Sequence, residues 1–203
     1  MKELRRPNSE ELENLKEVVV FNSAEQEYWD DMIARRDSEL APGNHEARIG
    51  FYFNELKQTQ GKFGGRVAVK RTLEYLIGHA HEWLGTYTSE GQDFGLRAEM
   101  CEKAVLWYQR ADETIGFLSD YALRQAEASG MVAKFRTKAG LNDNATAWYA
   151  QRFGQLIGAV LGPGTAVQNG AIPENLKRMA DATVDSVAQL YLFRDKAPEG
   201  KLN

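Results

Sequence analysis

Mostly apolar side chains between Met100 and Tyr121 recur at alternating steps of four and three residues, and this spacing constrains the fold most. Its positions are Met100, Ala104, Trp107, Ala111, Thr114, Leu118 and Tyr121. Residues three and four apart share one face of an α-helix, so the series predicts a helical seam that packs against other helices. We expect one long helix over residues 94–128, which either kinks at Gly116 or protrudes toward a neighbouring subunit.

Helical periodicity extends over the rest of the chain, which predicts an all-α fold: an irregular bundle of about six or seven helices with at most a minor β-hairpin. Further helices are predicted to start near residues 9, 23, 44, 66, 145 and 173, where capping residues or breakers occur. Ser23-x-x-Gln26 has the pattern of a capping box. Residues 131–138 suit either a short strand or a helical turn, and Asn169-Gly170 favours a small hairpin within the loop 162–172.

Composition is that of an ordinary globular protein, because 43% of the 203 residues are hydrophobic and 27% are charged. We expect a single helical domain over residues 1–203, with an N-terminal arm at 1–8 and a C-terminal tail at 195–203. The single cysteine, Cys101, excludes an internal disulfide framework and suits a reducing compartment. No stretch approaches the roughly 18 apolar residues of a membrane span, and the charged first residues lack a secretory signal. The expected location is cytoplasmic, or within a virus particle assembled in the cytoplasm.

Small residues recur at steps of four from Thr146 through Ala150, Gly154 and Gly158 to Gly162, inside an apolar stretch. Glycine inside a helix costs up to about 1 kcal/mol relative to alanine, so a close helix contact is expected to offset it. The stretch is too short for dimerisation within a membrane, and its glycines lie too far inside the helix to bind an anion. The sequence therefore predicts that residues 145–161 form the central, most buried helix, with this small-residue ridge against a neighbour.

A glycine-rich, basic segment at residues 60–71 is the best candidate for binding an anion or nucleic acid. Its glycines precede a predicted helix start, where free backbone N–H groups and the helix dipole favour anions. The candidate residues are Gly61, Lys62, Gly64, Gly65, Arg66, Lys70 and Arg71. The alternative is a flexible turn between helices with a basic rim. General affinity for nucleic acid is not expected, since the chain has a net charge of −4 and a pI near 5.5.

Catalytic chemistry has few candidates in this sequence. Cys101 lies in an apolar helical stripe, which predicts a buried and inert thiol. His45, His79 and Glu82 are the nominees for a mixed histidine and carboxylate site, either enzymatic or metal-binding. The Glu-x-x-His pairs of di-iron bundles do not occur in the chain, and we predict neither a metal nor a cofactor.

These features together favour a non-enzymatic structural or interaction protein, a subunit of a larger assembly of like copies or of other subunits. A virus or phage particle is one setting considered for such a subunit. Two alternatives stay open: an anion-binding or nucleic-acid-binding regulator that uses residues 61–71, and an enzyme with a histidine and carboxylate site.

Overall fold

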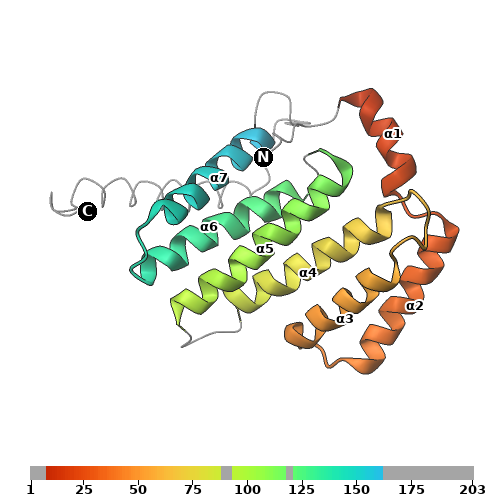
Figure 1. Cartoon of the computed structure of the whole chain (residues 1–203), viewed down its shortest axis with the longest axis horizontal. Coiled ribbons are helices and arrows are strands. Elements are labelled where there is room, and N and C mark those ends of the chain that lie inside the picture. The colour runs from red at the N-terminus through yellow and green to blue at the C-terminus, as the bar shows by residue number, and fades with distance from the viewer. Residues whose placement is uncertain (1–7, 88–92, 118–120, 162–203) are drawn as a thin grey trace.

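The computed structural model describes residues 8–87, 93–117 and 121–161, and this part of the chain is all-α, as the periodicity predicts (Figure 1). Within these ranges there are seven helices and no strand. The helices are α1 (Ser9–Val19), α2 (Ser23–Glu39), α3 (His45–Gln58), α4 (Ala68–Thr86), α5 (Phe94–Ile115), α6 (Ala122–Lys138) and α7 (Asn144–Leu161). None of them combines the length and the apolar character needed to cross a membrane.

Helices α4, α5, α6 and α7 lie side by side in chain order, and each packs against the next (Figure 1). Helix α3 packs on the other side of α4, and α2 lies beside α3 at that end of the array. The connections between consecutive helices are short, which favours antiparallel neighbours. Among the described helices, α6 is the one that packs extensively against α7, so α7 lies at an edge of the array.

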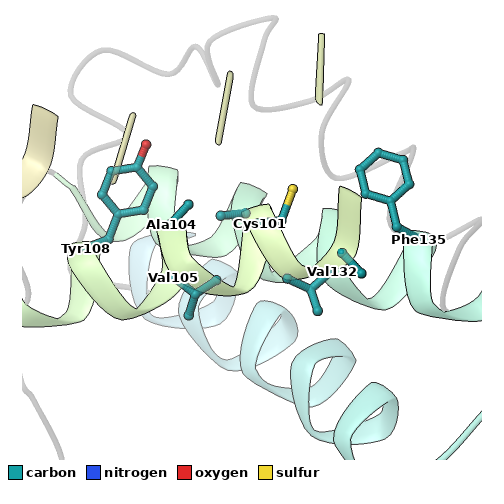
Figure 2. Close-up of a cluster of buried hydrophobic side chains, with 8 residues drawn as sticks. Cys101, Ala104, Val105, Tyr108, Val132 and Phe135 are labelled. Carbon is teal, nitrogen blue, oxygen red and sulfur yellow. The ribbon is translucent and has the colours of Figure 1, made fainter. Parts of the chain in front are cut away.

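Buried apolar side chains form two main clusters, one on each side of the pair α4 and α5. The first joins α5 to α6 and includes Cys101, Ala104, Tyr108, Val132 and Phe135. In Figure 2, the side chains of Cys101, Ala104 and Tyr108 project from one side of α5, whereas that of Val105 points to the other. The second cluster consists of Met32, Tyr52, Val69, Leu73, Ile77 and Trp107, so it unites α2, α3 and α4 with α5.

Two glycines of α4 bring its backbone very close to α5. A Cβ atom on Gly78 would lie 2.8 Å from the ring of Tyr108. A Cβ atom on Gly85 would lie 2.6 Å from the Sγ atom of Cys101 and 2.9 Å from the carbonyl oxygen of Arg97. These separations are shorter than van der Waals contact, so any larger residue at either position would force the helices apart. Close helix packing through glycine therefore occurs at the contact between α4 and α5.

The predicted long helix over residues 94–128 is wrong, because Gly116 divides it into α5 and α6. Gly116 adopts a left-handed conformation with φ of 75°, and its N–H group donates to the carbonyl oxygens of Asp112 and Glu113. Glycine takes this conformation without steric cost, which makes it a common residue at helix C-termini. Residues 131–138 belong to α6, so the helical alternative for that segment is confirmed.

Helix α2 begins at Ser23, as predicted, but its capping box lies one residue earlier than predicted. Asn22 caps the helix by accepting from the N–H group of Glu25, and the carboxylate of Glu25 accepts from the N–H group of Asn22, both at 2.9 Å. Asparagine is as good a cap as serine, and this reciprocal pair satisfies two N–H groups that the helix leaves free. The prediction of a box at Ser23 and Gln26 was wrong in register only.

Several predictions fall outside the described residues. They concern Leu118, Gly162, the hairpin within 162–172, the last helix from residue 173, and the tail at 195–203. Residues 1–7 of the predicted arm are also outside them. The single-domain assignment for residues 1–203 stays a prediction.

Candidate functional site

Helix α7 exposes a face that carries no charge, and we call this set of residues the outer face of α7. Its exposed residues are Ala147, Trp148, Gln151, Gly154, Gln155 and Gly158. In a chain of which 27% is charged, a surface helix normally presents charged side chains to water. Arg152 is the only charged residue between Asn144 and Leu161.

The opposite face of α7 packs on α6. Phe153 and Leu156 are buried there beside Ala126, and a Cβ atom on Gly130 of α6 would lie 3.0 Å from the ring of Phe153. Arg152 also turns inward and donates to the side-chain carbonyl of the fully buried Gln125, at 2.7 Å. Burial lowers the pKa of Arg152, although the negative charge of Asp112 opposes that effect. These contacts fix the orientation of α7 and leave its outer face uncharged.

Among the described residues, α7 is not the central, most buried helix that the sequence predicts for residues 145–161. Helix α7 lies at an edge of the array, and Gly154 and Gly158 are exposed. No heavy atom of the described residues lies within 4 Å of a Cβ built on either glycine. Only Thr146 of the ridge is buried among the described residues, and Ala150 is half-buried. That another helix packs against this ridge therefore stays a prediction.

The seam residues of α5 have mixed environments. Trp107 is buried and meets the ring of Phe53 on α3 edge-on, with ring centroids 4.9 Å apart. Met100 is half-buried. Tyr121 comes after the break at Gly116 and stacks on Tyr75 of α4, with ring centroids 4.1 Å apart. The heptad spacing thus continues through the break because both sides of it pack against α4.

The glycine-rich segment 61–71 forms the turn between α3 and α4. Gly61 and Gly64 have positive φ angles of 74° and 63°, and no described heavy atom lies within 4 Å of a Cβ built on Gly61, Gly64 or Gly65. The N-cap residue of α4, Val67, forms no side-chain capping bond. The backbone requirement for glycine here is therefore that of a tight turn.

The four cationic side chains of this segment all contact groups within the chain. Arg66 forms a 2.7 Å ion pair with Glu25 and donates to the carbonyl oxygen of Val20 at 2.6 Å. The other contacts are Lys62 over the ring of Tyr28 at 4.1 Å, Lys70 with Glu74 at 3.9 Å, and Arg71 over the ring of Tyr121 at 4.2 Å. An anion at this turn would compete with these contacts, so the segment has less free charge than its sequence suggests.

Arg66→Gln is expected to lower the free energy of unfolding by about 2 kcal/mol, because it leaves the fully buried Glu25 carboxylate without its cation. The expected loss is moderate because the side chain of Arg66 is 29% exposed. Urea denaturation measures the change. Lys70→Gln is the matched control, since Lys70 is more exposed and lies 3.9 Å from its carboxylate partner. Equal effects of the two substitutions would contradict the structural role of Arg66.

The three nominated residues His45, His79 and Glu82 do not form one site. His45 stacks on Trp83 with ring centroids 4.8 Å apart, at the start of α3. Glu82 is buried and faces Tyr108 of α5. The described residues contain no group of three or more histidine, cysteine or acidic side chains that could hold a metal ion.

Glu82 belongs to a polar cluster at the junction of α4, α5 and α6, which we call the Glu82 cluster and define as Glu82, Tyr108 and Arg124. Glu82 and Tyr108 are buried, whereas the side chain of Arg124 is 44% exposed. The Tyr108 hydroxyl donates a short hydrogen bond to the Glu82 carboxylate. The Nη1 atom of Arg124 lies 3.9 Å from that carboxylate and 3.0 Å from Glu127. Burial raises the pKa of Glu82 to about 7, and the negative charge of Glu127 adds to the effect.

The sequence shows Glu82 as an ionisable residue but does not identify Tyr108 and Arg124 as its partners. Tyr108 lies within the apolar stripe of α5, and Arg124 lies beyond the break at Gly116. The sequence signal that could indicate such a partner is a tyrosine at an apolar position of a helix, because a buried tyrosine hydroxyl usually finds a hydrogen-bond acceptor.

No family model matches the chain, and neither the curated proteins nor the solved structures include a match to it.

Proposed function

We propose that the protein is a non-enzymatic interaction subunit that associates with copies of itself through the outer face of α7. The observation that supports this most directly is the absence of charge on that face in a chain rich in charged residues. A helix at the edge of an array gains little from an uncharged, glycine-containing face in water, because each such glycine weakens the helix by up to about 1 kcal/mol. Contact with another helix would offset that cost.

The ridge of Ala150, Gly154 and Gly158 suits contact with an identical helix. Residues at steps of four form ridges that interdigitate when two helices cross near −50°. A twofold axis through such a crossing would place the same face on both subunits, and a face without charge meets its copy without electrostatic repulsion. Trp148, which is 39% exposed, would supply an aromatic anchor beside the crossing.

One helix face is small for a stable dimer. Specific interfaces bury about 800 Å² on each partner, whereas α7 is only about 27 Å long. Leu141, which is 42% exposed in the turn before α7, extends the apolar surface. Other subunits of an assembly could use the same surface, and a cytoplasmic or viral setting stays part of this proposal.

Gly158→Glu is expected to abolish the association, because it places a carboxylate on the ridge that the crossing would bury. The described residues leave open space around Gly158, so the fold of each subunit is expected to persist. Light scattering at micromolar concentration measures the mass, and circular dichroism the fold. Gly50→Glu is the matched control, since Gly50 is an exposed glycine of α3 with no heavy atom of the described residues within 4 Å of a built Cβ.

A wild-type protein that stays a monodisperse monomer would refute the proposal. A Gly158→Glu variant with unchanged mass would show that association uses another surface. A loss of stability in a monomeric variant would show that the chain itself covers the outer face.

A further inference from the structure

The seam between the start of α3 and the end of α4 gathers basic side chains from both helices. The ring of His45 stacks on Trp83 of α4, with an angle of 9° between the ring planes. Helices α3 and α4 are antiparallel (Figure 1). The residue one turn after His45 on α3 therefore lies opposite the residue one turn before Trp83 on α4. Those two positions are Arg48 and His79. We call His45, Arg48 and His79 the basic seam.

The basic seam has no acidic partner among the described residues. None of its three side chains forms an ion pair or hydrogen bond there, and the Nε atom of Arg48 is shielded from solvent without a partner. By contrast, Arg35 forms an ion pair with Glu55 at 2.8 Å and Arg136 forms one with Glu102 at 2.8 Å. A guanidinium nitrogen removed from water without an acceptor is costly, which suggests that an acceptor from outside the chain completes it.

The groups around His79 are mainly cationic. Arg48 and His45 approach from α3 and Arg124 from α6, and after burial these three lower the pKa of His79. Burial and Arg48 likewise lower the pKa of His45. Tyr75 stacks on His79 within α4, and the nearest carboxylate along α4, Glu82, is held by Tyr108.

We propose that the basic seam binds an oxyanion of the phosphate class. The Arg48 guanidinium offers a fixed positive charge and donors, and the two imidazoles become donors on both nitrogens when protonated. The first N–H groups of α3, a helix of 14 residues, add a favourable dipole at the same end. Trp83 and Tyr87, which are 37% and 59% exposed, contact each other at the end of α4 beside the seam. This site is independent of the outer face of α7.

A phosphate titration followed by proton NMR of the histidine rings tests this proposal. The chain has three histidines, and bound phosphate is expected to raise the pKa values of His45 and His79 by about one unit, since the anion stabilises their protonated forms. His81 is the internal control, because it is buried and the charged residue that acts on its pKa is Lys103, not a residue of the basic seam. Affinity for phosphate is therefore expected to increase as the pH falls below 6.5.

Arg48→Gln is expected to weaken phosphate binding at least about tenfold, as loss of one charge-assisted contact implies. Arg110→Gln is the matched control, because Arg110 stacks on Trp107 at 4.6 Å, away from the seam. Unchanged pKa values of His45 and His79 at millimolar phosphate would overturn the proposal. So would equal shifts of all three histidines, or an Arg48→Gln variant that binds phosphate as well as the wild type does.

Discussion

Replacing Gly85 with alanine is expected to lower the free energy of unfolding by about 3 kcal/mol, at the upper end of the usual cost of overpacking a core. The added Cβ atom would meet the Sγ atom of Cys101 at 2.6 Å and the carbonyl oxygen of Arg97 at 2.9 Å. Neither atom can move aside easily, because Cys101 is fully buried and the carbonyl oxygen belongs to the α5 backbone.

The same displacement would strain a second set of contacts. The Arg97 guanidinium donates to the carbonyl oxygens of Gly85 and Thr86, both at 2.8 Å, and so ties the start of α5 to the end of α4. Carbonyl groups at a helix C-terminus have no partner within the helix, so these bonds satisfy groups that burial would otherwise leave unpaired. A wider separation between α4 and α5 weakens both bonds.

Gly50→Ala is the matched control for Gly85→Ala. Gly50 is an exposed glycine inside α3, and a Cβ atom there meets no heavy atom of the described residues within 4 Å. Alanine is expected to stabilise the protein by up to about 1 kcal/mol at this position, through helix propensity alone. Urea denaturation measures both variants. A Gly85→Ala protein as stable as the wild type would show that the contact between α4 and α5 is looser than described.

The glycine positions show how far the sequence predicts packing. The argument that a glycine within a helix marks a close contact holds at Gly78, Gly85 and Gly130. It fails within the described structure at Gly154 and Gly158, whose four-residue spacing made them the more conspicuous pair in the sequence. Spacing defines which residues share a face, but the contact depends on which helix lies opposite, and that is a property of the whole array.

Helix positions were easier to predict than helix ends. Periodicity and capping residues give the helical class and approximate starts, because both signals depend on neighbours along the chain. The heptad spacing continues from Trp107 to Tyr121, so the sequence predicts at most a kink at Gly116 and not the end of a helix. Trp107 before the break and Tyr121 after it both contact residues of α4, so the apolar pattern persists although the helix does not.

The candidate sites depend on pairing across helices, which the sequence does not specify. His79 and Glu82 lie three residues apart on α4, and this spacing suggested a shared site. In the structure, His79 lies among the cations of the basic seam and Arg124, whereas Glu82 accepts a hydrogen bond from Tyr108. Arg66 likewise suggested anion binding by its position after two glycines, yet its partner Glu25 lies 41 residues earlier.

Opposite responses to pH are expected from the adjacent residues His81 and Glu82. Burial lowers the pKa of His81 from 6.5 to about 4, and it raises the pKa of Glu82 from 4.5 to about 7. The folded protein therefore favours the neutral form of both side chains. Each difference between the folded and unfolded pKa corresponds to about 3 kcal/mol in the free energy of unfolding, once the pH has crossed the whole interval between the two pKa values.

The two contributions have opposite signs with respect to pH. Unfolding lets His81 take up a proton, so its contribution is complete above pH 6.5 and is lost as the pH falls through about 4. Glu82 binds its proton more tightly in the folded state, so its contribution is complete below pH 4.5 and is lost as the pH rises through about 7. Between pH 4.5 and 6.5 the two slopes oppose each other, and together they contribute little net change in stability.

Single substitutions separate the two slopes. The amide of Glu82→Gln can still accept a hydrogen bond from Tyr108. Relative to the wild type, the free energy of unfolding of this variant is expected to rise as the pH increases from 4.5 to 7. In His81→Gln the relative stability is expected to fall as the pH rises from about 4 to 6.5, by about 3 kcal/mol. Urea denaturation across this range measures both, and the difference from wild type removes contributions that the proteins share.

The double variant Glu82→Gln, His81→Gln distinguishes this explanation from a general loss of packing. Its stability relative to the wild type is expected to vary little between pH 4.5 and 6.5. The double variant lacks both titrating groups, and in the wild type the opposite pH slopes of these two groups cancel over this range. Damage to packing would lower stability by a similar amount at every pH and would leave no slope in either single variant. Slopes of the same sign in the two single variants would contradict the burial of one of the two side chains in its neutral form.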